Sequence, residues 1–308
     1  MTPTTRRSFI AATLATTCSK LTAQEAADPV IDIHQHMNYH LRSDEHLLLH
    51  QRAMGVTKSI ILPSGTYVNR LSTHNGKSNG LAAKCLSTAW ARDFAQMHPD
   101  AYLWACNEVT DAVSAPMEIE KWLNQGACMI AEQKFMVECD SAASQKLYEL
   151  AAAYHVPILL HFQHQTYNLG YDRFHNMLAK YPKTTFIGHA QAFWGNIDKH
   201  HDPKVNYPKG KVTPGGLTDR YLADYPNMYA DMSAGSGLLA LTRDEDHTRG
   251  FFDRHQDKIL YGSDCADHLG RGPGCQGAAT LAAIRKLSSS KVVERKILFG
   301  NANKLFRL

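Results

Sequence analysis

The chain has 308 residues, of which 44% are hydrophobic and 20% charged, a composition typical of a globular protein and unlike that of a disordered one. Its formal net charge is only +4, and the basic residues are scattered rather than interleaved with aromatic ones, so nucleic-acid binding is not indicated. The 17 histidines are unusual, and several of them stand where strands are expected to end.

The N-terminus has the layout of an export signal. Arg6 and Arg7 are followed by Ser-Phe-Ile and by a short, weakly apolar run that is too short to span a bilayer. This resembles the twin-arginine signal of bacteria. We therefore expect residues 1–27 to be a signal peptide, cleaved between Ala23 and Ala27, and the protein to be periplasmic or extracellular. A disordered or weakly helical cytosolic tail is the alternative.

Six cysteines follow residue 27, at positions 85, 106, 128, 139, 265 and 275. Their wide, irregular spacing predicts no disulfide framework, and the absence of a Cys-x-x-Cys motif gives no sign of a thiolate zinc site. A disulfide between Cys265 and Cys275, across one loop, is the one pairing that the sequence leaves as an alternative.

Beyond Asp28, short apolar runs alternate with longer amphipathic stretches, which predicts repeated strand–helix units around a parallel sheet. Strands are expected over 30–33, 57–62, 101–106, 127–135, 156–160, 184–188, 228–232 and 258–262. Helices are expected over 44–54, 81–97, 116–124, 141–154, 172–180, 277–287 and 292–306. Eight such units predict a single-domain α/β fold over residues 28–308, a (β/α)8 TIM barrel. A doubly wound open sheet is the alternative, but no Gly-rich phosphate turn supports it.

One connection, residues 191–224 between the sixth and seventh strands, is long and rich in turn-forming residues. We expect it to be a loop on the side of the barrel where the active site lies.

Polar residues with metal-binding or proton-transfer chemistry end the predicted strands. In a barrel these ends converge on one mouth, so residues far apart in sequence meet there. They are His34 and His36 after the first strand, Glu132 and Lys134 on the fourth, His161 after the fifth, His189 after the sixth and Asp264 after the eighth.

Five segments carry a resemblance to the amidohydrolase superfamily, and more closely to its amidohydrolase-related group, which includes aminocarboxymuconate-semialdehyde decarboxylase-like proteins. The segments are Ile31-Asp32-Ile33-His34-Gln35-His36, Pro157-Ile158-Leu159-Leu160-His161, Phe186-Ile187-Gly188-His189, Ile259-Leu260-Tyr261-Gly262-Ser263-Asp264 and Phe299-Gly300-Asn301-Ala302-Asn303-Lys304-Leu305. They run from the first strand to the last helix, and they are specific for the superfamily but weakly specific for the substrate.

The resemblance implies that His34, His36, His161 and Asp264 hold a divalent metal. It also implies that His189 is either a ligand of a second metal or the general acid/base. Neutral imidazoles with one carboxylate leave a coordination position open, where a water can lose a proton near neutral pH. Asp264 can accept that proton, and His189 can polarise the developing oxyanion or protonate the leaving group.

The fourth strand leaves the number of ions open. The superfamily uses either a bridging carboxylate or a carboxylated lysine there, and members close to the decarboxylases use neither. Glu132 is the preferred bridging ligand over Lys134, because a carboxylate needs no modification to bind; an ion pair between these two residues is the alternative. Two ions are expected if Glu132 binds and one if it does not. Zinc is expected, with Mn²⁺ or Fe²⁺ as alternatives.

The sequence thus predicts an enzyme that activates water to cleave a C–N, C–O or lactone-like bond in a small molecule. Non-oxidative decarboxylation of an aromatic or unsaturated carboxylic acid is the alternative, favoured if Arg42 or Arg271 holds a carboxylate. Two further alternatives for the function are a non-catalytic metal-binding barrel and, ranked last, a phosphodiesterase. The expected partner is a small-molecule substrate, with no nucleic acid and no stable membrane insertion; homo-oligomerisation stays open.

Overall fold

A computed structural model of the protein describes residues 28–66 and 85–308. The predicted signal peptide, residues 1–27, lies outside the described residues, as does the start of the helix predicted over 81–97. No helix among the described residues is long and apolar enough to cross a membrane.

Eight short parallel strands form the centre of the fold. They are β1 (Ile31–Gln35), β2 (Lys58–Ile61), β3 (Tyr102–Trp104), β4 (Ile130–Gln133), β5 (Ile158–His161), β6 (Phe186–His189), β7 (Met228–Asp231) and β8 (Ile259–Leu260). Strands β1 to β3 pair in chain order, and so do β4 to β8. All eight sequence-predicted strands are present, most of them shorter than predicted.

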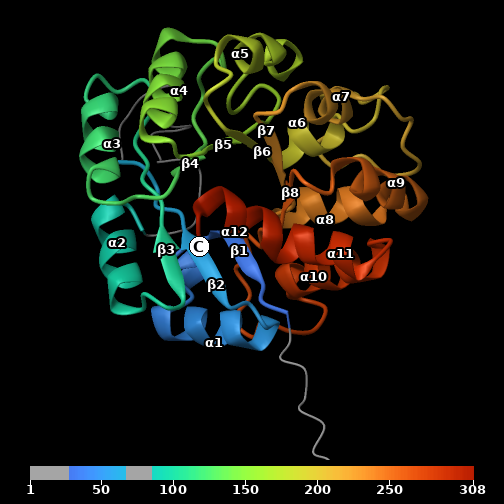
Figure 1. Cartoon of the computed structure of the whole chain (residues 1–308), viewed down its shortest axis with the longest axis horizontal. Coiled ribbons are helices and arrows are strands. Elements are labelled where there is room, and N and C mark those ends of the chain that lie inside the picture. Colours follow the sequence, from blue (N-terminus) through green and yellow to red (C-terminus); the bar gives the residue numbers. More distant parts are fainter. Residues whose placement is uncertain (1–27, 67–84) are drawn as a thin grey trace, which may run out of the picture.

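Backbone hydrogen bonds join the two groups of strands into a ring. Between β3 and β4, the amide of Cys106 donates to the carbonyl of Met129 at 2.9 Å. Between β8 and β1, the amide of Ile33 donates to the carbonyl of Tyr261 at 3.1 Å. The ring and its surrounding helices confirm the predicted single-domain (β/α)8 barrel, and Figure 1 shows the helices outside the strands.

The inside of the ring is filled by one compact set of apolar side chains from seven of the strands and their ends. These side chains are Ile31, Ile33, Ile60, Leu62, Ala105, Met129, Ala131, Leu159, Ile187 and Leu260. Ala302 packs with them, with partly buried Leu305 and Phe306 beside it, so the C-terminal helix covers the barrel interior at one end. The polar strand ends are therefore left at the opposite end.

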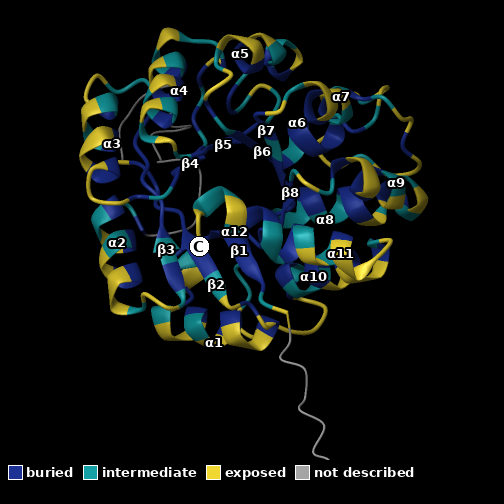
Figure 2. Cartoon of the chain, in the orientation of Figure 1, coloured by how far each residue is buried: buried dark blue, intermediate teal, exposed yellow. Residues whose placement is uncertain are grey.

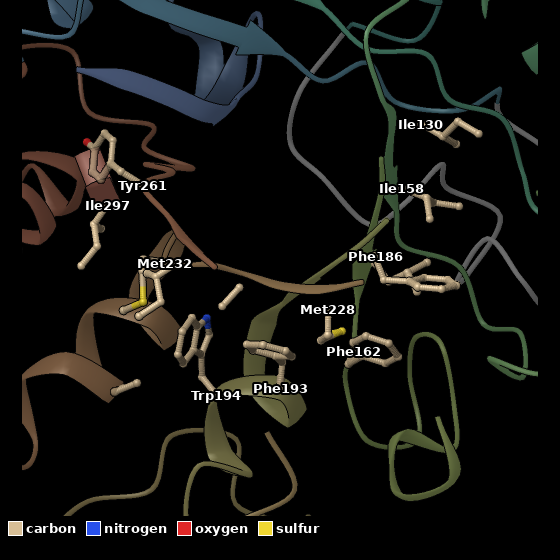
Figure 3. Packing of buried hydrophobic residues seen from close by; sticks show 14 of the residues in the cluster. Ile130, Ile158, Phe162, Phe186, Phe193, Trp194, Met228, Met232, Tyr261 and Ile297 are labelled. Atoms are coloured by element: carbon tan, nitrogen blue, oxygen red, sulfur yellow. The ribbon is translucent and has the colours of Figure 1, made fainter. Parts of the chain in front are cut away.

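A larger apolar layer lies between the strands and the helices. Figure 3 shows Phe162, Phe186 and Met228 gathered on the outer side of β5 to β7, and all three are fully buried. Figure 2 shows that the strands are mostly buried while the helices expose their outer faces.

The helices include most of those expected from the sequence. They are α1 (Asp44–Met54), α2 (Thr88–Met97), α3 (Ala115–Leu123), α4 (Ala142–Tyr154), α5 (His175–Lys180), α6 (Ala190–Gly195), α7 (Leu217–Asp224), α8 (Ala234–Thr242), α9 (Glu245–His255), α10 (Gln276–Leu287), α11 (Lys291–Arg295) and α12 (Asn301–Phe306), with a π-helical turn over Lys296–Gly300 between the last two.

The connection predicted as a loop over 191–224 is in fact helical at both ends, in α6 and α7. Helices α8 and α9 were not expected either. Helix α6 has only six residues, five of them buried, and α8 is apolar with two glycines. Neither shows the alternation of polar and apolar faces by which a helix is recognised in a sequence.

The barrel interior should be sensitive to loss of volume. We expect Leu159→Ala to lower the free energy of unfolding by about 2–5 kcal/mol, because it removes buried apolar contacts and leaves a cavity. Leu159 is fully buried, whereas Leu49 on α1 is 52% exposed. Urea denaturation should therefore show a much smaller change for Leu49→Ala, and equal losses for the two variants would contradict this description of the core.

Candidate metal centre

Strands β1 and β8 meet at the polar end of the barrel and bring three predicted site residues together. The amide of Asp264 donates to the carbonyl of His34 at 2.8 Å. The Nε2 atoms of His34 and His36 are 3.2 Å apart, and Asp264 Oδ1 lies 3.9 Å from the first and 3.5 Å from the second. These side chains are almost completely buried.

Asp32 fixes the junction of these two strands. Its Oδ1 accepts from the amides of His34 at 3.0 Å and Ser263 at 2.8 Å, and its Oδ2 accepts from the Ser263 hydroxyl. Burial raises the pKa of Asp32 to about 6. Asp32 thus holds the backbone at two points next to the cluster: at His34 and at Ser263, the residue before Asp264.

The carboxylate of Glu132, from β4, lies between two pairs of imidazoles. Its Oε2 is 3.6 Å from Nε2 of His34 and 3.7 Å from Nε2 of His36. Its Oε1 is 2.6 Å from Nδ1 of His161 and 3.7 Å from Nε2 of His189. All five residues are buried, so this carboxylate joins the two halves of the cluster.

Two residues that the sequence did not indicate, Asp231 and Ser233 at the end of β7, orient the histidines. Nδ1 of His34 donates to Asp231 Oδ2 at 2.7 Å. The Ser233 hydroxyl donates to the same oxygen at 2.8 Å and accepts from Nδ1 of His189 at 2.9 Å. Asp231 stands one residue before the end of the strand predicted over 228–232, which is the one sequence signal that could have identified it.

These anchors decide which ring nitrogens face the cluster. Nδ1 of His36 donates to the carbonyl of Leu62 at 2.8 Å, and Nδ1 of both His34 and His189 is held by β7. Each of the three rings therefore directs Nε2 inward, the arrangement expected when the other nitrogen binds an outer acceptor. His161 differs, because its inward nitrogen is Nδ1.

Three of the four imidazoles in the cluster are uncharged. Burial lowers the pKa of His36 to about 3 and that of His161 to about 4. Burial and the charge of His34 lower the pKa of His189 well below its usual range. These three rings are neutral near pH 7, which is the form that binds metals.

His34 and the two carboxylates behave differently. Burial opposes the charged form of His34, but Asp264 and Asp231 raise its pKa well above the ordinary value. Burial likewise opposes ionisation of Glu132, yet Lys134 and the bond to His161 hold its pKa well below normal. Burial raises the pKa of Asp264 to about 7. A proton on His34 thus supplies the positive charge that these carboxylates attract.

The donor set fits a divalent ion. Glu132 Oε2 and Asp264 Oδ1 are buried and have no hydrogen-bond partner among the described residues, which is costly for carboxylate oxygens unless a cation compensates them. Their distances to the two Nε2 atoms run from 3.5 to 3.9 Å. Ligands about 2.0–2.1 Å from a tetrahedral ion lie about 3.3–3.4 Å from one another, so a small contraction would complete the site.

The other residues singled out in the sequence lie around this cluster. Lys134 Nζ is 5.5 Å from the centre of the Tyr167 ring. Among the described residues, the Lys, Arg and His nitrogens within 4.0 Å of the Glu132 carboxylate are all from histidines, so an ion pair with Lys134 is not formed. Arg42 is buried and donates to the carbonyls of His36, Cys265 and Asp267. Arg271 is exposed.

A cavity of about 490 Å³ lies beside the cluster. Gln163 lines it, and the Gln163 side-chain oxygen is 3.3 Å from Nε2 of His161. Most of the remaining wall comes from the connection between β5 and α5, which includes His164, Tyr171 and Arg173. Gln163 therefore connects the cavity to the buried histidines.

Comparison with solved structures finds the same fold at low sequence identity. An uncharacterised TIM-barrel protein from Bordetella bronchiseptica has a TM-score of 0.61 and 14% identity over 91% of this chain and 98% of its own. 5-Carboxyvanillate decarboxylase LigW from Sphingomonas paucimobilis has a TM-score of 0.57 and 15% identity over 92% and 100%. The probable 2-pyrone-4,6-dicarboxylic acid hydrolase of Acinetobacter baumannii has a TM-score of 0.57 and 13% identity over 91% and 99%.

At these identities the similarity concerns the fold. No family model matches the chain, and no curated protein matches its sequence. The neighbours that share the barrel include both a decarboxylase and a hydrolase, so the fold alone leaves the reaction undecided.

Asp231 should raise the pKa of His34 in the metal-free protein. We expect Asp231→Asn to lower that pKa by about one to three pH units, because an adjacent carboxylate favours the charged imidazole and an amide does not. NMR titration of the histidine ring signals measures it. Asp224→Asn, an exposed change at the end of α7, is the control, and an unchanged His34 pKa in Asp231→Asn would refute the assignment.

Proposed function

We propose that this protein is a metal-dependent hydrolase of the amidohydrolase superfamily, which activates water to cleave a C–N, C–O or lactone-like bond in a small molecule. The observation that carries the proposal is the carboxylate of Glu132, whose two oxygens face two different pairs of imidazoles. Such a carboxylate can bridge two ions, an arrangement used to activate water in hydrolases.

The residues divide into two groups of ligands. His34, His36 and Asp264 would hold one ion together with Glu132 Oε2. His161 and His189 would hold a second together with Glu132 Oε1. Zinc suits this set of imidazole and carboxylate donors, and Mn²⁺ or Fe²⁺ could replace it. When bound, an ion here supplies Lewis acidity that makes water nucleophilic near neutral pH.

Proton transfer would then fall to Asp264 and His189. Asp264 is placed to take up the proton that the attacking water loses, since its carboxylate lies within the cluster and burial raises its pKa to about 7. His189 is neutral and its Nδ1–H donates to Ser233, so its unprotonated Nε2 would first have to accept a proton in the reaction and could then pass it to the leaving group if one ion alone is bound. With two ions bound, His189 would serve as a ligand instead.

The positive charge of Lys134 supports a substrate with an anionic group. This cation is close enough to the cluster to lower the pKa of Glu132 and of His161, and its side chain is half-buried. The decarboxylase alternative called for Arg42 or Arg271 to hold a carboxylate. Arg42 is instead occupied by backbone carbonyls, which favours hydrolysis.

Export by the twin-arginine route stays a prediction from the sequence.

Removal of metal should abolish activity. Elemental analysis of the purified protein should find a divalent ion in the His34–Glu132 cluster. Dialysis against a chelator should remove turnover of a panel of amides, esters and lactones, and Zn²⁺ or Mn²⁺ should restore it. Glu132→Gln should reduce the bound metal, because an amide is a weaker ligand than a carboxylate. Full activity in metal-free protein would refute the proposal.

His189 should contribute to the chemical step. We expect His189→Asn to lower kcat by about 10²–10⁴-fold, the usual contribution of a general acid/base. A comparable loss would follow from loss of a second ion, and metal content measured on the variant separates the two roles. His200→Asn, a change of an exposed histidine, should leave kcat unchanged. Equal activity in all three proteins would remove His189 from catalysis.

Oxygen-18 water distinguishes hydrolysis from decarboxylation. Hydrolysis incorporates one labelled oxygen into the product, whereas non-oxidative decarboxylation of aromatic acids releases CO₂ and places a solvent hydrogen on the ring. We expect incorporation of label without CO₂ release. Release of CO₂ without label would overturn the hydrolase in favour of the lyase.

A further inference from the structure

A second group of metal-binding side chains lies outside the Glu132 cluster. Cys265 Sγ and Cys275 Sγ are 3.6 Å apart, and Nε2 of His50 is 3.6 Å from Cys275 Sγ. All three donor atoms lie within 4.8 Å of one another, and all three side chains are buried. We call these three residues the Cys2His cluster. Both cysteines are free thiols.

The fold builds this cluster from two elements that are distant in sequence. His50 lies on α1, and Cys265 and Cys275 both lie in the connection between β8 and α10, Cys275 directly before α10. The connection packs closely on α1: a Cβ at Gly270 would lie 2.3 Å from the carbonyl oxygen of His50. A Cβ at Gly277 would lie 2.9 Å from Met54 Sδ. Both positions therefore need glycine.

The His50 ring has no other hydrogen-bonding role. Its Nδ1 is buried without a partner among the described residues, and its Nε2 has the thiol of Cys275 as its neighbour. Nε2 is therefore the nitrogen that the ring would offer to an ion shared with the two sulfurs.

The distances match those of a tetrahedral thiolate site. With Zn–S near 2.3 Å and Zn–N near 2.0–2.1 Å, two sulfurs lie about 3.8 Å apart and a sulfur and a nitrogen about 3.6 Å apart. The observed separations are both 3.6 Å. The thioether of Met54, 3.8 Å from Cys275 Sγ, adds a fourth soft atom at the same spot.

We propose that His50, Cys265 and Cys275 form a second metal site, which binds a thiophilic ion such as Zn²⁺ and is separate from the Glu132 cluster. Thiolates select soft ions, whereas the imidazoles and carboxylates of the Glu132 cluster accept harder ones. The ion would tie α1 to the residue that follows Asp264. Arg42 makes a similar connection, because its guanidinium donates both to the carbonyl of His36 and to that of Cys265. The site would therefore hold Asp264 in place.

Cobalt distinguishes this site from the Glu132 cluster. Co²⁺ bound by thiolates gives a near-ultraviolet sulfur-to-metal charge-transfer band, which a site made only of histidines and carboxylates cannot give. Titration of the reduced, metal-free chain with Co²⁺ should produce this band, with a final intensity that corresponds to one thiolate-bound ion per chain, because Co²⁺ taken up by the Glu132 cluster adds nothing to it. Zn²⁺ should remove the band, because Zn²⁺ binds thiolates more tightly.

Substitutions locate the band. Cys275→Ser and His50→Gln should weaken or abolish the charge-transfer band. Cys128→Ser is the control: it changes a partly buried cysteine two residues before β4, and it should leave the band intact. Activity is not needed for this readout, so the result does not depend on the proposed hydrolase reaction.

Thiol labelling of the unmodified chain tests the site even if the variants fail to fold. Zn²⁺ should slow the alkylation of Cys265 and Cys275, identified by peptide mass, and should leave Cys128 unaffected. A reduced chain that gives no charge-transfer band, or that shows no protection by Zn²⁺, would overturn the proposal. So would freshly purified protein in which Cys265 and Cys275 form a disulfide that cannot be reduced without unfolding.

Discussion

The arrangement at the mouth of the barrel depends on one buried carboxylate. Glu132 is fully buried, and among the described residues the Lys, Arg and His nitrogens within 4.0 Å of its oxygens are those of four histidines from β1, β5 and β6 and their ends. An ionised group at this depth is tolerated only when opposite charge and hydrogen bonds compensate it, and here Lys134 and the bond to His161 do so. Asp231, Ser233 and the carbonyl of Leu62 hold three of the rings with Nε2 toward the carboxylate, the orientation in which these nitrogens and the carboxylate could share a cation.

The fold and the main site residues could be predicted from the sequence for a simple reason. Parallel strands of a barrel all end at one mouth, so a polar residue just after each apolar run is brought there whatever its distance along the chain. This rule predicts that His34, His36, His161, His189 and Asp264 lie close together. It cannot choose between Glu132 and Lys134, which both follow from it, and the preference for Glu132 comes from its carboxylate, which needs no modification to bind an ion.

The same rule could not reveal residues whose importance depends on contacts across the barrel. Asp231 and Ser233 act on His34 and His189, which lie 197 and 44 positions away, and their own sequence context is unremarkable. The cysteines likewise had no recognisable spacing, because the third member of their cluster comes from α1. Helices α6 and α8 escaped prediction because burial on most sides removes the polar face that marks an amphipathic helix.

The bond between the amide of Asp264 and the carbonyl of His34 joins the first strand to the end of the last. Most of the chain must be synthesised before these two residues can meet, so a polypeptide that has not yet reached β8 contains the other candidate ligands, including Glu132, but lacks Asp264. Contacts between residues so far apart in sequence form late and slowly in folding, and a chain cut short before β8 would have His34 and His36 without Asp264 beside them.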